Sequence, residues 1–152
     1  MAVLREIILT GDPILRQKAA TVRRFGDNLA ALLDDMALTM YAVKGVGLAA
    51  PQVGISKRII VVDDGDGLIE MVNPEIISSH GMEEDYESCL SIPGREGKVP
   101  RSASIKISAQ DREGKPFTLK AKDLLARILQ HEIDHLNGRL FIDIMTEEVK
   151  RT

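Results

Sequence analysis

The stretch Asp123-Leu-Leu-Ala-Arg-Ile-Leu-Gln-His-Glu-Ile-Asp-His-Leu-Asn-Gly138 places apolar residues at three- and four-residue intervals. This spacing predicts an amphipathic helix, with Asp123 as its N-cap and Gly138 just past its last turn. His-Glu-x-x-His runs inside it from His131 to His135. Residues four apart lie on one helix face, so both imidazoles can bind one metal ion while Glu132 reaches a water on that ion.

The neighbours of the two histidines argue against an ordinary surface helix. Ile128, Leu129, Ile133 and Leu136 flank the histidines. The face that holds them is therefore at least partly buried, where an unpaired imidazole or carboxylate is costly. We expect this helix to bind a metal ion.

A catalytic ion needs a third protein ligand and one open position. Residue type alone offers Cys89, His80, Asp143, Glu147 and Glu148 as candidates. Cys89 is the softest donor among them, but a lone cysteine is more often a small buried hydrophobe. The choice of third ligand stays open on these grounds.

Length and composition favour one globular domain over residues 1–152, with 44% hydrophobic and 28% charged residues. The net charge of −3 comes from mixed signs, and aromatics make up only 3%. Both features disfavour nucleic-acid binding, which uses basic stripes and aromatic platforms. A single cysteine, no targeting pattern and no apolar run of ~18 residues lead us to expect a cytoplasmic protein that does not bind membranes.

The remaining elements follow from hydrophobic period and turn residues. Asp12-Pro13 predicts a short helix start, and Asp27 to Gly45 predicts a longer helix with a core stripe of leucine and methionine. The predicted strands are Arg58–Asp63, Leu68–Asn73, and a hairpin of Ser104–Gln110 with Pro116–Lys122. The expected fold class is α+β, with short antiparallel strands packed around a central metal-binding helix.

Three separated segments, in this order, together resemble the peptide deformylase family. Gly45–Gln52 resembles its Gly-x-Gly-x-Ala-Ala-x-Gln motif, Glu87–Ser91 resembles Glu-Gly-Cys-Leu-Ser, and Gln130–His135 resembles Gln-His-Glu-x-x-Asp-His. The similarity extends to Asp12–Arg16 and to Val99–Arg101, so it covers nearly the whole chain. It implies the fold of that family and a metal-dependent hydrolase that removes the N-formyl group from the initiator methionine of new proteins and releases formate.

The resemblance also implies residue roles. One divalent ion is held by Cys89, His131 and His135; Fe²⁺ is the expected natural ion, while Zn²⁺, Ni²⁺ and Co²⁺ suit the same ligands. Glu132 transfers the proton, while the Gln52 side chain and the Leu90 backbone N–H stabilise the oxyanion. The residues expected to contact substrate are Gly45, Val46, Gly47, Leu124, Ile128 and Arg101. The implied partners are N-formylmethionyl peptides of nascent chains, met at the ribosome.

Two departures from the family keep alternatives open. Ser88 stands where the family has glycine, and the chain ends soon after the metal-binding helix. The first departure motivates an alternative in which the protein is a catalytically weak or inactive relative that binds metal or peptide. A zincin-type protease is a further alternative, whose third ligand would be Asp143, Glu147 or Glu148. The sequence leaves open the native metal, the oligomeric state and the preference beyond formylmethionine.

Overall fold

A computed structural model of the chain describes residues 1–149, so the last three residues of the expected domain lie outside it. Its helices are α1 (Asp27–Ala42) and α2 (Asp123–Leu136), with short 3₁₀ turns η1 (Pro13–Arg16), η2 (Ala50–Val53) and η3 (Phe141–Asp143). Its strands are β1 (Gly47–Ala49), β2 (Ile59–Val62), β3 (Ile69–His80), β4 (Glu83–Cys89), β5 (Ile92–Arg101), β6 (Ser104–Gln110), β7 (Pro116–Lys122) and β8 (Glu147–Glu148). The expected α+β class is confirmed.

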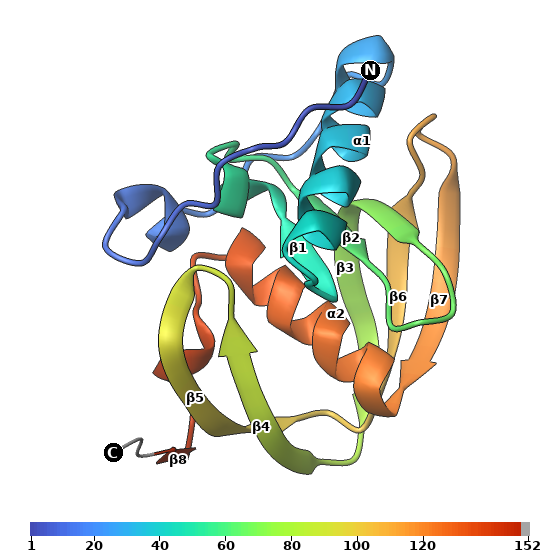
Figure 1. Ribbon diagram of the computed structural model, residues 1–152. Coiled ribbons are helices and arrows are strands. Elements are labelled where there is room, and N and C mark those ends of the chain that lie inside the picture. The colour runs from blue at the N-terminus through green and yellow to red at the C-terminus, as the bar shows by residue number, and fades with distance from the viewer. Residues whose placement is uncertain (150–152) are drawn as a thin grey trace.

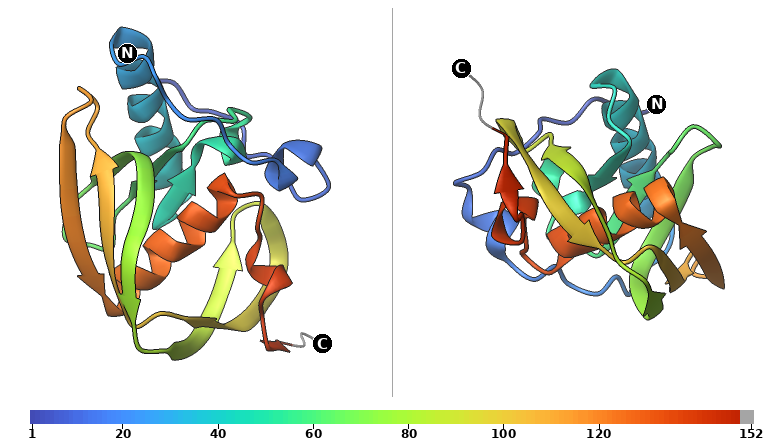
Figure 2. Two further views of the ribbon diagram at one scale, coloured as in Figure 1. Left: turned by 180° about the vertical axis from the view of Figure 1, so that it is seen from behind. Right: turned by 90° about the horizontal axis from the view of Figure 1, so that it is seen from below.

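Two antiparallel sheets enclose the helix α2. The larger sheet has the order β1-β2-β3-β6-β7, and the smaller has the order β4-β5-β8. In Figure 1, α2 crosses the middle of the molecule, with the larger sheet on one side and β4 and β5 on the other. Figure 2 shows the same arrangement from behind and from below.

The two helices cover opposite faces of the larger sheet. Strand β2 is buried on both faces: Ile60 and Val62 belong to the core beneath α2, whereas Ile59 and Val61 belong to the core beneath α1. This alternation follows from the two-residue period of side chains along a strand. The α1 side chains that form this core are Leu29, Leu32, Leu33, Met36 and Met40. The predicted leucine and methionine stripe is therefore core.

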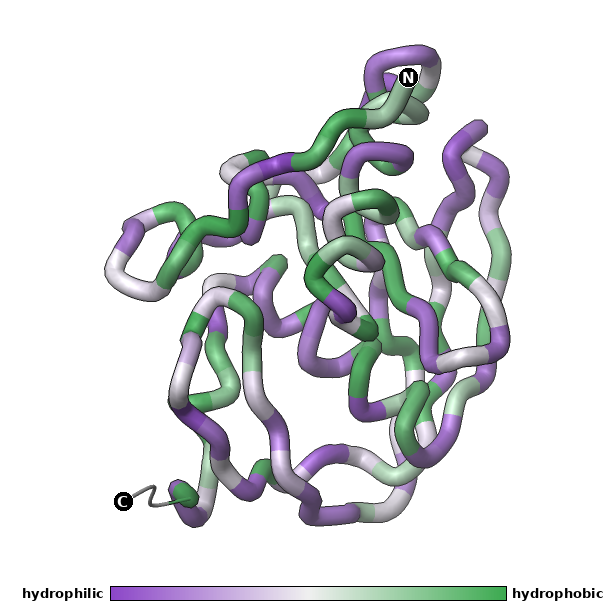
Figure 3. The backbone as a smooth tube through the Cα atoms, viewed as in Figure 1, coloured by the Kyte–Doolittle hydropathy of each residue, from purple (hydrophilic) through white to green (hydrophobic). Residues whose placement is uncertain are grey.

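The predicted hairpin is also confirmed. Strands β6 and β7 pair from Ser104 opposite Lys122 to Gln110 opposite Pro116. The connecting turn is closed by Asp111, whose Oδ1 accepts the backbone N–H groups of Glu113 and Lys115. The tip of this hairpin is hydrophilic in Figure 3. Alternate residues of β6 point into the core beneath α2, as a half-buried strand requires.

Several details differ from the sequence-based expectations. Strand β3 continues beyond Asn73 and Pro74 to His80, with a register shift between Val72 and Glu75 that accommodates the proline. Asp123 is the first residue of α2 with a left-handed φ of 56°, and the N-cap is Lys122. Strands β4 and β5 were not predicted. Neither helix within residues 1–149 is long and apolar enough to cross a membrane.

Candidate metal centre

Three possible metal-ligand side chains meet where α2 passes the end of β4. One donor atom each from Cys89, His131 and His135 lies within 4.8 Å of the others. Cys89 Sγ is 3.4 Å from His135 Nε2. Cys89 is the last residue of β4, and Leu90-Ser91 form the tight turn that leads into β5. The fold therefore brings together the two histidines and the cysteine, which are more than forty residues apart in sequence.

The other candidates for the third ligand lie elsewhere. His80 lines a separate groove between β3, β6 and β7. Asp143 binds the guanidinium of Arg16, and Glu148 binds that of Arg95. Among the described residues, the group of His, Cys, Asp and Glu side chains that could hold one ion is Cys89, His131 and His135, so it includes neither these two acids nor Glu147. The structure therefore gives no geometric basis for a zincin-type ligand set downstream of the helix.

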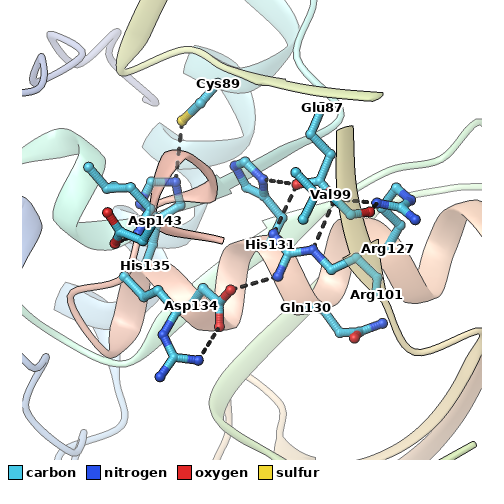
Figure 4. A network of polar contacts seen from close by, with 12 residues as sticks. Glu87, Cys89, Val99, Arg101, Arg127, Gln130, His131, Asp134, His135 and Asp143 are labelled. Carbon is cyan, nitrogen blue, oxygen red and sulfur yellow. Dashed lines mark hydrogen bonds and ion pairs between the residues drawn. The ribbon is translucent and has the colours of Figure 1, made fainter. Parts of the chain in front are cut away.

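Glu87 is the centre of a buried ionic network beside the ligands (Figure 4). Its Oε1 accepts from His131 Nδ1 at 2.8 Å and from Arg101 Nη2 at 2.9 Å. Its Oε2 accepts from Arg101 Nε at 2.9 Å and from Arg127 Nη1 at 2.7 Å. Burial raises the pKa of this carboxyl, but the hydrogen bonds from Arg101 and His131 outweigh it and lower the pKa to about 2. Glu87 is therefore a carboxylate that fixes Nδ1 of His131 and leaves Nε2 to face the ligand cluster.

Arg101 occupies a different place from the one expected. Its side chain is 5% exposed and bridges Glu87 to Asp134 on α2, donating from Nη1 to Asp134 Oδ2 at 2.6 Å. It does not line the cavity beside the metal ligands, whereas Arg127 does. Its donors already pair with Glu87 and Asp134, so the structure gives no support to the expected substrate contact of Arg101, which stays a prediction. The Arg101 side chain lies between β5 and α2, in the same ionic network as the ligand His131.

The surroundings of the two histidines suit a bound cation. Burial lowers the pKa of His131, but its hydrogen bonds to Cys89 and Glu87 outweigh burial and raise that pKa to about 10, so the surroundings of this ring favour a positive charge at its position. A metal ion held there would take the place of the proton on the ring, because a ligating imidazole is neutral. Burial and the charge of His131 lower the pKa of His135, which keeps that imidazole neutral, as a ligand must be. One thiolate and two imidazoles form a donor set that fits Fe²⁺, Zn²⁺, Co²⁺ or Ni²⁺.

Glu132 lies next to this cluster and is 4% exposed. Its Oε1 is buried without a hydrogen-bond partner among the described residues. Burial is the main cause that raises the pKa of this carboxyl to about 7, with a smaller contribution from the charge of Glu87. A carboxyl poised near neutral pH beside a metal site can accept and return a proton.

A cavity of about 370 Å³ opens above these groups. It contains five of the six residues expected to contact substrate: Gly45, Val46, Gly47, Leu124 and Ile128. Gln52 also lines it, held by a hydrogen bond from Ala49 N to its Oε1 at 2.9 Å. Its Nε2 lies 3.1 Å from Ser91 Oγ and 3.6 Å from Cys89 Sγ, so the amide N–H₂ points toward the ligand cluster.

Ser88 lies on the cavity wall at a register shift between Glu87 and Cys89. Its φ is not positive, since the non-glycine residues with positive φ are Lys44, Asn73 and Asp123. The backbone at this position therefore does not require glycine.

The sequence predicted the three metal ligands that the structure brings together, but it assigned no role to Glu87 or Asp134. Glu87 belongs to the motif segment Glu87–Ser91, and Asp134 belongs to the motif segment Gln130–His135. Their place in these motifs was the available sign that they have a function. Their function depends on Arg101 and Arg127, which come from other segments. The network therefore became visible only with the fold.

Known proteins match this chain over nearly its whole length. The family model described as polypeptide deformylase matches residues 4–151. A peptide deformylase of Pelotomaculum thermopropionicum is 57% identical, covering 94% of this chain and 92% of its own, and one of Carboxydothermus hydrogenoformans is 52% identical, covering 94% and 93%. The crystal structure of the Thermotoga maritima peptide deformylase superposes with a TM-score of 0.93 at 42% identity, covering 95% and 99%. The chain therefore belongs to the polypeptide deformylase family, as a metal-dependent hydrolase with an intact Cys-His-His site.

Proposed function

We propose that this deformylase removes the formyl group from the N-terminal methionine of newly made proteins, releasing formate. The observation that carries the proposal is the position of Glu132, a buried carboxyl without a partner between the Cys-His-His cluster and an apolar-walled cavity. Such a group beside a metal site is suited to hydrolysis of an amide.

The substrate binds as an extended chain between two open sheet edges. Strand β1 ends the order of the larger sheet and β4 ends that of the smaller one, within residues 1–149. Residues 45–47, which lead into β1, and residues 86–90, at the end of β4, both line the cavity. An extended peptide adds to such edges through main-chain hydrogen bonds, with pockets for alternate side chains.

The methionine side chain lies against apolar cavity walls. Val46 and Leu124 are 50% and 56% exposed at the cavity, and Ile128 lies on the same helix as Leu124, one turn further along. An unbranched thioether fills irregular apolar space well. These contacts hold the methionine side chain while the formyl group reaches the ligand cluster.

The catalytic roles follow from position. When bound, a divalent ion supplies Lewis-acid polarisation of the formyl oxygen and lowers the pKa of a water molecule. Glu132 accepts the proton of that water and delivers it to the leaving amine nitrogen. Gln52 Nε2 and the Leu90 backbone N–H donate to the developing oxyanion, and each such donor contributes roughly 3 kcal/mol to transition-state stabilisation. Glu87 orients His131 throughout.

We further propose Fe²⁺ as the natural ion. A ferrous site with a thiolate ligand is prone to oxidation, so protein purified in air should lose activity and nickel should restore it. Metal analysis of anaerobically purified protein, with activity followed during air exposure, tests this. Unchanged activity after prolonged exposure with iron still bound would contradict Fe²⁺ as an air-sensitive ion here.

The proposed partners are N-formylmethionyl nascent chains, met in the cytoplasm as they leave the ribosome. This place of action rests on the substrate, because formylated N-termini arise during translation. Co-sedimentation with ribosomes that carry a formylated nascent chain, compared with empty ribosomes, is the measurement. Failure to co-sediment with the ribosomes that carry the nascent chain would remove the ribosomal part of the proposal and leave the chemistry intact.

The central experiment follows formate release from formyl-Met-Ala-Ser. Metal-loaded wild type should turn over, Glu132→Ala should bind metal but lose activity, and Cys89→Ala should lose the metal. No formate from metal-loaded wild type would refute the proposed reaction. Normal metal binding by Cys89→Ala would refute the ligand assignment.

A further inference from the structure

Two glycines of the first motif segment each pack against a residue from another motif segment. A Cβ built on Gly47 would lie 2.6 Å from Glu132 Oε2 and 3.0 Å from its Cδ and Cγ. A Cβ built on Gly45 would lie 3.0 Å from Leu90 Cδ1 and 3.6 Å from Met40. Neither glycine has a positive φ, so backbone freedom does not explain why glycine stands at either position.

The backbones on both sides of the Gly47–Glu132 contact are fixed. Gly47 pairs with Val62 of β2, and the next residue, Leu48, is fully buried under α1. On the opposite side, Leu129 and Leu136 anchor α2 in the core and are fully buried. A methyl group on Gly47 would therefore displace the Glu132 side chain, and the space open to that side chain is the substrate cavity, which Glu132 lines.

We propose that Gly45 and Gly47 are positioning residues: Gly47 leaves the space that holds the Glu132 carboxylate, and Gly45 leaves the space that seats Leu90, whose N–H faces the reacting carbonyl. The proposal deepens the function above and rests on the roles given there to Glu132 and Leu90.

This role differs measurably from the simpler one in which the glycines only let the peptide approach the backbone. Loss of peptide contact raises KM with kcat retained, whereas displacement of the proton-transfer group lowers kcat. For metal-loaded Gly47→Ala we expect kcat to fall on the order of 100-fold or more, with KM changed less than about threefold. Gly26→Ala is the matched control, since no atom lies within 4 Å of its added Cβ, and its kcat should equal that of wild type.

A double-mutant cycle on thermal unfolding tests the contact without using activity. In the metal-loaded protein, Gly47→Ala should lower Tm by roughly 4–8 °C when Glu132 is present. In the Glu132→Ala background, where space for the methyl exists, the same change should lower Tm by about 1 °C or less. Gly45→Ala should show the same coupling to Leu90→Ala at smaller size, because it meets one terminal methyl.

Equal Tm losses in both backgrounds would overturn the proposal, as would a raised KM with unchanged kcat. If Gly47→Ala alone does not fold, folding of Gly47→Ala/Glu132→Ala supports the proposal, and failure of both variants overturns it. The Tm coupling does not depend on turnover. A wild-type protein that releases no formate would therefore refute the proposed function and leave the positioning test standing.

Discussion

The two faces of α2 are buried by opposite chemistry. One face packs dry against the larger sheet through Ala126, Leu129, Ile133 and Leu136. The other face meets β4 and β5 through charges, with Arg127, His131 and Asp134 paired to Glu87 and Arg101. We call the first the dry face and the second the charged face. The dry face anchors the helix in the core, and the charged face orients His131.

The stability of the protein should respond differently when a side chain is removed from one face or from the other. Apolar contacts are numerous and similar, so deletion of one side chain removes its own transfer and cavity energy. The charges depend on one another, since removal of one leaves its partners buried and unpaired. The metal site lies on the charged face, where His131 receives its orientation from Glu87. We therefore expect function and stability to be coupled on this face and separable on the other.

The largest effect should come from Glu87→Ala. This change leaves Arg101 and Arg127 buried without their main acceptor and should lower the free energy of unfolding by about 3–5 kcal/mol. Metal affinity should fall by roughly 10–100-fold, because His131 loses its orienting carboxylate. Urea unfolding and competition with a chelator are the two measurements.

Glu148→Ala is the matched control for this variant. Glu148 accepts two hydrogen bonds from Arg95 at 2.9 and 2.8 Å, the same bidentate geometry that Glu87 has with Arg101, but in an exposed position. Exposed pairs of this kind contribute little to stability, so we expect no measurable change. Equal destabilisation by both variants would mean that burial does not distinguish the two pairs.

Leu129→Ala probes the dry face and should have the next largest effect. Leu129 is fully buried, and its truncation should cost about 2–4 kcal/mol of unfolding free energy. Metal content and kcat per bound ion should stay within about twofold of wild type below the unfolding transition. A tenfold fall in kcat with metal retained would show that the dry face also sets the catalytic geometry, and the separation of the two faces would be wrong.

The sequence predicted the dry face and the ligand histidines because both are local patterns. The apolar period of α2, its His-Glu-x-x-His spacing and the alternation in β6 and β7 all lie within short windows. The charged face was not predicted, because Arg101 and Arg127 lie 14 and 40 residues from Glu87. A periodic pattern within a short stretch of sequence does not indicate ion pairs between residues that are so far apart.

Strands β4 and β5 escaped prediction for a related reason. Their sequences, Glu-Glu-Asp-Tyr-Glu-Ser-Cys and Ile-Pro-Gly-Arg-Glu-Gly-Lys-Val-Pro-Arg, are rich in charge, glycine and proline and lack a clear apolar alternation. Their strand character depends on pairing with each other and on the ion pairs to α2. Arg101 was expected at the substrate for the same reason, since its partners could not be seen in the sequence.

The carboxyls of Glu132 and Glu87 should affect the protein in different pH ranges, Glu132 through activity and Glu87 through stability. Glu132, with its pKa raised to about 7 by burial, must be ionised to accept a proton, so kcat should fall about tenfold per pH unit below its midpoint. A bound cation beside it lowers that pKa, which places the midpoint somewhat below 7 in the loaded enzyme. Measurement of kcat from pH 8 to 5 checks this, and Glu132→Asp should shift the midpoint.

Glu87 should affect stability in a lower pH window. Its folded-state pKa of about 2 lies below the ordinary value of 4.5, so its stabilising contribution is complete above 4.5 and is lost as pH falls toward 2. Activity should therefore decline between pH 7 and 5 while the contribution of Glu87 to stability stays constant. Below pH 4.5 the free energy of unfolding of Glu87→Ala should therefore fall less steeply with decreasing pH than that of wild type. If wild type and variant lose stability in parallel there, Glu87 is not the titrating group.

The smallest effect should come from Ser88→Gly, although Ser88 stands between Glu87, the centre of the ionic network, and the ligand Cys89. Its ordinary φ means that serine carries no backbone strain here, and its side chain is exposed on the cavity wall. We expect kcat/KM for formyl-Met-Ala-Ser to change by about threefold or less, which corresponds to ~0.6 kcal/mol. Since neither Glu87 nor Cys89 changes its contacts, metal affinity should equal that of wild type. A gain of 100-fold or more would show instead that the serine side chain obstructs the bound peptide and that the natural protein is a weakened catalyst.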